Sequence, residues 1–290
     1  MPLLHLYEKM KKQGHKLTEK TAEGGETKNT PFHQSWIGGV RVESAFPQIS
    51  GKKVDPIIFI HGGCHGSWVF RNYLSFFAES GWESHALNWF SHNGSQSLSP
   101  EHFIVRSIED VKEEIALIVS TLSVPPILVA HSMGGMAAQK FAEENDLRAL
   151  VLIAPVVSIE AGVDSIDLAI EEDQVWPVPP FDVARRLFFD GLDNDQSEYF
   201  YSLLCPESPR CVYEATRFTL SVNYENIRCP ILALGAEHDL LVPPGYVRAL
   251  AELSGADFRL VLGRGHNLLL EPNWRATSGT IRDWLTENCF

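Results

Sequence analysis

From Phe32 onward the chain alternates between short apolar runs and longer segments with helical periodicity. The runs Ile57–Ile60 and Ile127–Ala130 are apolar at every position, which is typical of strands buried on both faces of a parallel sheet. Each run leads into a glycine-containing turn and then into a segment with apolar residues every three or four positions. Eight strands are predicted in this way, at 36–37, 40–46, 57–60, 85–89, 127–130, 147–154, 231–234 and 258–262.

The order of these elements predicts an α/β fold with a mostly parallel, eight-stranded sheet flanked by helices. Gly38 and Gly39 separate the first two strands and favour a tight turn, so these two form an antiparallel pair. One helix is expected to begin at Ser107, a residue type that caps helices, with Glu109 and Asp110 in its first turn. Other helices are expected near 68–79, 133–145, 244–253 and 274–288.

One stretch, residues 158–226, has helical patterns but no convincing strand, although it lies between two strands of the sheet. It is therefore predicted to be an inserted helical cap. The chain then divides into a polar N-terminal arm (1–31), a first part of the core (32–157), the cap (158–226) and a second part of the core (227–290). A few aromatic residues of the cap are expected to line an apolar pocket; the candidates are Trp176, Phe181, Phe188, Phe189, Tyr199, Phe200, Tyr201, Tyr213, Phe218 and Tyr224.

Composition and charge narrow the function classes. The formal net charge is −13, and such an acidic surface repels phosphate backbones, so nucleic acid is not an expected partner. No segment is long and apolar enough for a membrane span, and the charged start of the chain does not resemble a secretory signal. A cytoplasmic protein is therefore expected. The five cysteines have no common zinc or redox spacing, and no metal or organic cofactor is predicted.

The strongest chemical signal is the segment Ala130-His131-Ser132-Met133-Gly134-Gly135, between a predicted strand and a predicted helix. A serine in this position, with small residues two before and two after it, is typical of a nucleophile elbow. Ala130 stands at the first small position, where glycine is usual. Ser132 is therefore the candidate nucleophile.

A second signal, His61-Gly62-Gly63-Cys64-His65-Gly66, follows an earlier strand. Glycines let the backbone approach a substrate, and fixed N–H groups can stabilise a developing oxyanion. The expected donors of this oxyanion hole are the N–H groups of Gly63 and of Met133, the residue after the candidate nucleophile.

Two further loops supply an acid and a base. Asp239 lies in Gly235-Ala236-Glu237-His238-Asp239, directly after a strand, and its carboxylate is placed to orient a histidine. Glu237 is the alternative acid in the same loop. His266 follows the last strand, in Gly263-Arg264-Gly265-His266-Asn267. Ser132, Asp239 and His266 thus form a candidate catalytic triad.

The order Ser, Asp, His is the one found in the α/β-hydrolase superfamily, which the chain from about Phe32 to the C-terminus resembles. The segment His61–Trp68 also looks like the opening of the plant methylesterase and hydroxynitrile lyase group and its bacterial relatives, and the tail from Gly265 to Pro272 is similar to those bacterial relatives. The resemblance implies an α/β-hydrolase fold and cleavage of a carboxylic ester through an acyl-enzyme, as in a carboxylesterase. The many Phe and Tyr residues and the few cations of segment 158–226 predict that the ester is small and largely apolar.

Three other functions are compatible with this scaffold. A hydroxynitrile-type lyase needs a cation for the leaving cyanide, yet residues 158–226 contain no lysine and only four arginines, which are Arg185, Arg186, Arg210 and Arg217. A cofactor-free dioxygenase usually carries its acid after an earlier strand than Asp239 does. A non-enzymatic ligand receptor can retain the triad. The sequence does not name the substrate, and it is silent on the oligomeric state.

Overall fold

The computed structural model describes residues 32–48 and 55–289; the predicted N-terminal arm, 1–31, lies outside the described residues. The strands form one eight-stranded sheet in the order β1-β2-β4-β3-β5-β6-β7-β8. β2 pairs antiparallel with β1 and β4, and the remaining pairs are parallel, which confirms the predicted α/β fold. The strands are β1 (His33–Ile37), β2 (Val40–Ala45), β3 (Ile57–Ile60), β4 (Ser84–Leu87), β5 (Ile127–His131), β6 (Ala149–Ile153), β7 (Ile231–Ala236) and β8 (Asp257–Val261).

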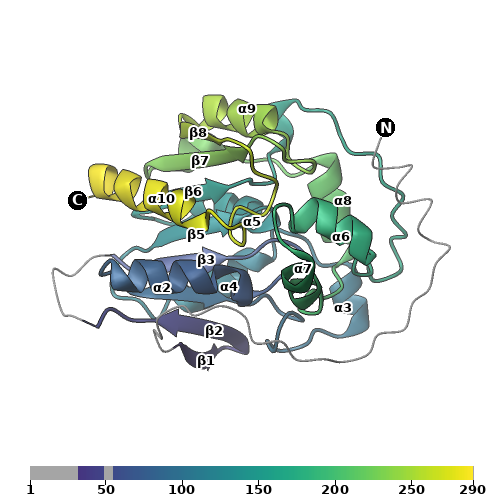
Figure 1. Cartoon of the computed structure of the whole chain (residues 1–290), viewed down its shortest axis with the longest axis horizontal. Coiled ribbons are helices and arrows are strands. Elements are labelled where there is room, and N and C mark those ends of the chain that lie inside the picture. Colours follow the sequence, from purple (N-terminus) through teal and green to yellow (C-terminus); the bar gives the residue numbers. More distant parts are fainter. Residues whose placement is uncertain (1–31, 49–54, 290) are drawn as a thin grey trace.

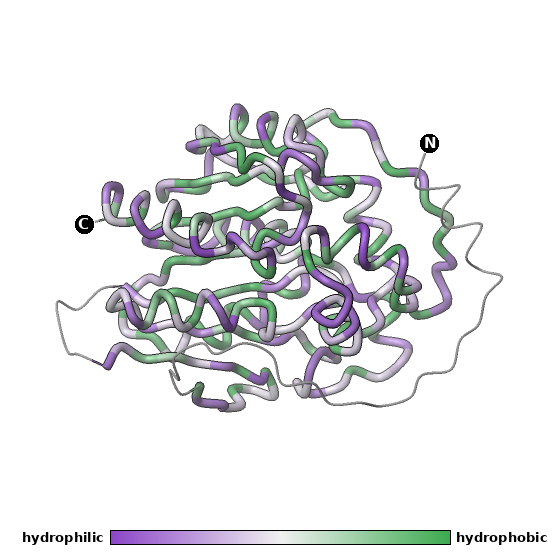
Figure 2. Tube along the Cα trace, viewed as in Figure 1, coloured by the Kyte–Doolittle hydropathy of each residue, from purple (hydrophilic) through white to green (hydrophobic). Residues whose placement is uncertain are grey.

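The apolar strands are buried on both faces because successive side chains point to opposite sides. In β3, Ile58 and Ile60 belong to the core under one helix layer, whereas Ile57 and Phe59 belong to the core under the other. The first layer contains α4 (Val111–Val119), α5 (Met133–Ala142) and α9 (Pro244–Ser254). The second contains α2 (Arg71–Glu79) and α10 (Trp274–Cys289), which lie side by side. Figure 2 shows the resulting band of hydrophobic chain through the middle of the molecule.

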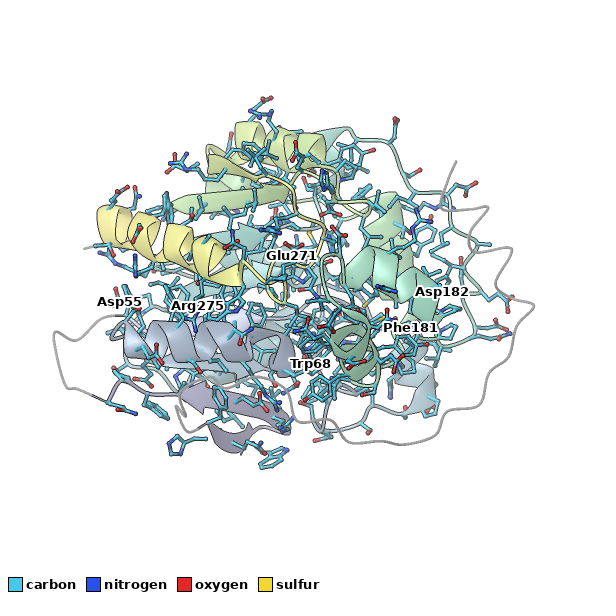
Figure 3. All side chains as sticks on the ribbon, viewed as in Figure 1. Asp55, Trp68, Phe181, Asp182, Glu271 and Arg275 are labelled. Atoms are coloured by element: carbon cyan, nitrogen blue, oxygen red, sulfur yellow. The ribbon has the colours of Figure 1, made fainter. Side chains whose placement is uncertain are left out.

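Between β6 and β7 the chain leaves the sheet and forms the cap, at one end of the molecule (Figure 1). Its helices are α6 (Phe181–Phe188), α7 (Asn194–Tyr201) and α8 (Pro209–Arg217), with short 3₁₀ turns at η2 (Ile159–Ala161) and η3 (Tyr224–Asn226). Aromatic stacking joins the cap to the core: Trp68, in η1 (Ser67–Phe70), stacks on Phe200 of α7 with ring centroids 5.6 Å apart (Figure 3).

Two local predictions differ from the structure. Ser107 is not the residue next to a helix, because α4 begins only at Val111. Its hydroxyl accepts from the N–H of Glu109 at 3.1 Å, and it also donates to the buried carboxylate of Glu214 in α8, 2.9 Å away, so this residue ties the core to the cap. A short helix, α3 (Pro100–Ile104), was not expected, and it has only five residues with one buried side chain. In the described ranges no helix has both the length and the apolar content that a membrane span requires.

Candidate active site

The four motifs singled out in the sequence follow strands β3, β5, β7 and β8. All four strands are parallel, so their carboxyl ends meet at one edge of the sheet. In α/β sheets this edge is the usual location of a ligand site. The topology therefore brings together side chains that are far apart in the sequence. Those of His65 and Asn267 are 202 positions apart and lie within 3.4 Å of each other.

Ser132 lies at the sharp turn between β5 and α5. Its backbone has φ 54° and ψ −123°, a conformation that a residue with a side chain rarely adopts. The turn also brings α5 against β3, where a Cβ on Gly134 would lie only 2.3 Å from the carbonyl oxygen of His61. Only glycine fits at that position, which explains the small residue two places after the serine.

The three predicted triad residues are hydrogen-bonded in a row. His266 Nδ1 lies 2.8 Å from Asp239 Oδ2, and His266 Nε2 lies 3.0 Å from Ser132 Oγ. The carboxylate accepts only, so the proton of the neutral ring belongs on Nδ1 and Nε2 is left to accept from the serine. Asp239 Oδ1 in turn accepts from the N–H groups of Leu241 and Val242, at 2.8 and 2.9 Å, and these bonds fix the carboxylate in place.

Glu237, the alternative acid, lies elsewhere in the same loop. Its side chain is exposed, and it accepts a hydrogen bond from the N–H of Gly263 at 2.7 Å. Asp239, by contrast, has a fully buried side chain in contact with His266. The geometry therefore favours Asp239 over Glu237 as the partner of the histidine.

Gly63 and Met133, the expected oxyanion donors, line one cavity together with Ser132. Met133 is the first residue of α5, and the first N–H groups of a helix have no partner within it. The carbonyl of Gly62 accepts from His61 Nδ1 at 2.8 Å, and the carbonyl of Gly63 accepts from His65 Nδ1 at 2.7 Å. Burial lowers the pKa of His65 to about 4 and that of His61 well below its usual value, so both rings act as neutral hydrogen-bonding groups.

His131, next to the nucleophile, is a site residue that the sequence analysis did not assign. Its Nε2 lies 3.1 Å from the carbonyl oxygen of His266, and the two rings lie 4.8 Å apart. Burial holds the pKa of His131 well below its usual value, so it stays neutral and does not oppose a positive charge on His266. Its position immediately before the serine was the only signal in the sequence that could have identified it.

The cavity beside Ser132 is almost entirely apolar. Its cap wall consists mainly of aliphatic side chains, which are Ile166, Leu168, Val183, Leu187, Val212 and Ala215. Of the aromatic candidates in the cap, only Trp176 and Phe188 contribute to it. Two of the ten candidates thus line the cavity, where a few were expected. Of the others, Phe189 and Phe200 pack on each other and on the core, whereas Tyr199 and Tyr213 are exposed.

No charged side chain from residues 32–48 or 55–289 lines this cavity. Arg185 and Arg186 are on the exposed face of α6, as expected from their pairing in the sequence. Arg210 pairs with Glu214 at 2.9 Å, and Arg217 pairs with Asp167 at 2.8 Å. In the part of the chain that the structure describes, no three His, Cys, Asp or Glu side chains are grouped so as to hold a metal ion.

The sheet topology, the strained serine turn and the hydrogen-bonded Ser, His and Asp define an α/β-hydrolase scaffold with a candidate hydrolytic site. In agreement, residues 57–277 match the family model described as "Alpha/beta hydrolase family". The match covers most of the chain, so the protein belongs to the α/β hydrolase family. No curated protein sequence matches the chain, and the resemblance to the methylesterase and hydroxynitrile lyase group stays a prediction.

Solved structures of the same fold are similar over nearly the whole chain. An enol-lactonase from Burkholderia xenovorans LB400 is 13% identical with a TM-score of 0.67, and the alignment covers 88% of this chain and 100% of that one. A monoacylglycerol lipase from Paleococcus ferrophilus is 19% identical with a TM-score of 0.60, covering 89% and 99%. A serine hydrolase involved in carbazole degradation is 17% identical with a TM-score of 0.65, covering 88% and 99%. At these identities the likeness shows the fold alone.

Proposed function

We propose that the protein is a serine hydrolase that cleaves small, largely apolar carboxylic esters through an acyl-enzyme. The observation that carries this proposal is the row of hydrogen bonds from Asp239 through His266 to Ser132, which ends at an apolar cavity. A buried carboxylate, a histidine in a fixed orientation and a serine at a strained turn are the arrangement that activates a hydroxyl as a nucleophile.

The reaction proceeds in two halves. His266 Nε2 takes the proton of Ser132 as Oγ attacks the ester carbonyl, while the N–H groups of Gly63 and Met133 donate to the oxyanion. The protonated histidine then gives its proton to the leaving alcohol, and the acyl group stays on the serine. A water molecule, deprotonated by His266, releases the acid. Asp239 holds the ring in the required orientation and stabilises its charged form.

An apolar substrate is expected because the cavity has few polar side-chain groups that could bind a polar one. Besides Ser132, its polar side-chain groups are the thiol of Cys64, the indole N–H of Trp176 and the hydroxyl of Thr216, which already donates to the carbonyl of Val212 at 2.8 Å. An anionic substrate would need a cation, and the cap arginines lie on the exposed face of α6 or are paired with acids outside the cavity lining. The same absence weighs against hydroxynitrile-type lyase chemistry. Two of the similar structures are a lipase and an enol-lactonase, which are enzymes that act on ester bonds.

The test is hydrolysis of p-nitrophenyl esters from acetate to decanoate, beside matched esters that carry a free carboxylate. We expect kcat/KM to rise by up to roughly tenfold for two added methylenes until the cavity is full, because each buried methylene contributes to binding. Ser132→Ala should lose about four or more powers of ten in kcat, whereas Ser80→Ala, at the end of α2, should match the wild type. Retention of more than about a tenth of the activity by Ser132→Ala would contradict the covalent mechanism. A preference for the carboxylate-bearing esters would contradict the substrate class.

A further inference from the structure

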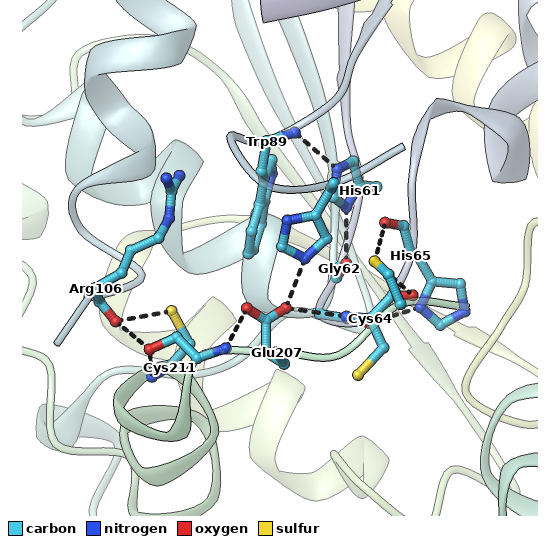
Figure 4. Close-up of polar contacts among 12 residues, drawn as sticks. His61, Gly62, Cys64, His65, Trp89, Arg106, Glu207 and Cys211 are labelled. Carbon is cyan, nitrogen blue, oxygen red and sulfur yellow. Dashed lines mark hydrogen bonds and ion pairs between the residues drawn. The ribbon is translucent and has the colours of Figure 1, made fainter. Parts of the chain in front are cut away.

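A buried pair of ionisable side chains, Glu207 and His92, takes no part in the triad. The pair lies beside the segment His61–Gly66 that follows β3 and carries the Gly63 N–H, which we call the oxyanion loop. Glu207 belongs to the cap, between α7 and α8, whereas His92 belongs to the core, in the loop after β4. Both side chains have no exposed surface, and His92 Nε2 lies 3.1 Å from Glu207 Oε2 (Figure 4). A buried ion pair costs desolvation energy, so its presence next to the site calls for an explanation.

The hydrogen-bond partners define the charges of the pair. His92 Nδ1 faces the carbonyl oxygen of Phe90 at 3.0 Å, and its Nε2 faces the carboxylate. Both partners accept, so both ring nitrogens carry protons and the ring is an imidazolium. Burial opposes this charge, but the Glu207 carboxylate and Cys205 together outweigh it and hold the pKa of His92 well above its usual value. Burial likewise opposes ionisation of Glu207, but His92 and the N–H groups of Cys64 and Ser208 together outweigh it and lower the pKa of Glu207.

Glu207 uses its carboxylate to hold backbone N–H groups of both the core and the cap. Oε2 accepts from the N–H of Cys64 at 3.0 Å, across 143 positions of sequence, and Oε1 accepts from the N–H of Ser208 at 2.8 Å. Its backbone pairs with Trp176 in both directions at 2.9 Å, and Trp176 lines the cavity. One cap residue therefore contacts the oxyanion loop and supports the cavity wall.

The oxyanion loop needs such support. Gly63 has no side chain to limit its backbone, and there is no room for one, since a Cβ would lie 2.5 Å from Met133 Sδ. Cys64 has φ 63°, an unfavourable conformation for a residue with a side chain. The peptide before Gly63 is held by His61, and the peptide after it is held by His65 at the carbonyl and by Glu207 at the N–H. Since peptides are planar, His61 fixes the plane that contains the Gly63 N–H, and the contacts of the next peptide limit the rotation of that plane about the Gly63 Cα.

We propose that Glu207 is a positioning residue that acts from the cap, through the N–H of Cys64, to hold the Gly63 N–H in place for the oxyanion. His92 keeps the Glu207 carboxylate ionised, so that both of its oxygens accept. This inference rests on the proposed function, because it assigns a role within that oxyanion hole. It also makes the cap a part of the catalytic apparatus as well as a wall of the cavity.

The test compares Glu207→Gln with the matched control Glu214→Gln. Glu214 is also a buried cap carboxylate that accepts from a core backbone N–H, that of Ile108 at 2.8 Å, but it does not contact the oxyanion loop. In Glu207→Gln the single amide oxygen can accept either from Cys64 and His92 or from Ser208, so the NH₂ group faces an N–H donor in either orientation and the contact that holds the loop is weakened. We expect kcat on p-nitrophenyl butyrate to fall by about ten- to a hundred-fold with KM changed less than about threefold, because the lost stabilisation belongs to the transition state. Phosphonylation of Ser132 by a fluorophosphonate, which also places an oxygen in the oxyanion hole, should slow by a similar factor. Glu214→Gln should keep wild-type values.

The outcomes separate the two proposals. Phosphonylation and hydrolysis at wild-type rates in folded Glu207→Gln would overturn the positioning role alone, as would a rise in KM with kcat unchanged, which would assign Glu207 to the cavity wall. Failure of the wild type to react with the ester series or the fluorophosphonate would overturn the proposed function as well. If Glu207→Gln does not fold, as judged by circular dichroism and thermal unfolding, Glu207→Asp decides. It keeps the charge opposite His92 but withdraws the carboxylate from Cys64, so a fall in kcat supports the role and an unchanged kcat refutes it.

Discussion

The core and the cap contribute to the site in opposite ways. The core supplies nearly all of its polar groups, from loops at the ends of four neighbouring strands, and these groups are joined by hydrogen bonds of 2.7–3.1 Å. The cap supplies mainly apolar side chains to the cavity, and it reaches the oxyanion loop with the carboxylate of Glu207 and with the thiol of Cys205, which lies 3.5 Å from the carbonyl oxygen of Cys64. The comparison suggests that the sheet determines the chemistry, whereas the cap determines which substrate reaches it.

The two regions also differ in how firmly the backbone is held. The core loops contain residues in strained conformations, Ser132 and Cys64, which persist because packing and hydrogen bonds leave them no alternative. Before α6 the cap runs from Gly162 to Pro180 without a named helix or strand. Its backbone contacts with other segments there include Ile166 N–H to Thr216 at 2.7 Å and the pairing of Trp176 with Glu207. Substitutions in the core loops should therefore change the rate of the chemistry, and substitutions of the cap residues that line the cavity should change the preference among substrates.

The largest expected effect concerns the acid of the core. In Asp239→Asn the amide favours the wrong tautomer of His266, since an NH₂ group in place of Oδ2 cannot accept from Nδ1. We expect kcat to fall by up to about ten-thousand-fold. Glu237→Gln, in the same loop, should change kcat by less than about threefold, because Glu237 is exposed and its carboxylate contacts the N–H of Gly263 and the ring of His238. The measurement is kcat on a good p-nitrophenyl ester, with the folded fraction checked by thermal unfolding.

A greater loss from Glu237→Gln than from Asp239→Asn would reverse this assignment. It would also contradict the view that the core supplies the polar groups of the site in fixed positions, because the catalytic acid would then be an exposed residue and not a buried one held by backbone N–H groups after β7. Asp239→Asn should unfold at a lower temperature than the wild type as well, because Oδ1 and Oδ2 together accept three hydrogen bonds, from Leu241, Val242 and His266.

A smaller and different effect is expected from the cap. Val183 lies on the buried side of α6 and lines the cavity, so Val183→Phe fills part of the space for the substrate. We expect kcat/KM for octanoate to fall by roughly tenfold and that for acetate to change by less than about threefold, since only the longer chain needs the lost volume. Arg185→Phe introduces the same side chain on the exposed face of that helix and should leave the preference unchanged. Equal losses for acetate and octanoate would mean that the cap acts on the chemistry at this position too.

The same contrast explains what the sequence could predict. The strands are short apolar runs, and the catalytic candidates follow them directly, so periodicity and strand-end motifs together placed Ser132, Asp239, His266 and the glycine loop at one edge of the sheet. Parallel pairing then brings these residues together whatever the connecting segments do. The inserted cap between β6 and β7 was predicted in the same way, because the alternation of strands and helices stops between Ser158 and Asn226, where helical patterns continue without a strand.

The features that the sequence did not predict depend on contacts between distant segments. Nothing in the pattern around Glu207 pairs it with His92 or with Cys64, because these contacts arise only when the cap closes on the core. A few aromatic residues of the cap were expected to line the cavity and two of them do, but the sequence could not say which two, because several others pack on the core or face the solvent. Ser107 was expected to cap a helix because a serine before acidic residues has this local preference; its hydroxyl does accept from the N–H of Glu109, but the bond to Glu214 could not be read from that pattern.

The smallest expected effect concerns the stability of the loop that carries His266. Glu271 accepts from the N–H of Gly265 at 2.9 Å and lies 3.4 Å from Arg264, and its side chain is only 4% exposed (Figure 3). Burial, opposed in part by the Gly265 bond and Arg264, raises the pKa of Glu271 from 4.5 to about 7. The unfolded chain therefore loses this proton at lower pH than the folded protein does. As the pH rises from about 4.5 to about 7, ionisation favours the unfolded state and stability falls, with no further change from this residue above that range.

Glu271→Gln keeps an oxygen for Gly265 and removes the ionisation, so its melting temperature should gain on that of the wild type by about 5 °C between pH 5 and pH 8. The measurement is thermal unfolding of both proteins at pH 5, 6, 7 and 8. Glu252→Gln, on the exposed side of α9, controls for the loss of one negative charge. The melting temperatures of Glu271→Gln and the wild type could instead differ by the same amount at every pH, or by less as the pH rises. That result would show that Glu271 is ionised throughout this range. An ion pair between Glu271 and Arg264 would then hold the loop that carries His266. This core loop would be stabilised by a buried carboxylate and its cation, in the same way as the contact that Glu207 and His92 make between cap and core.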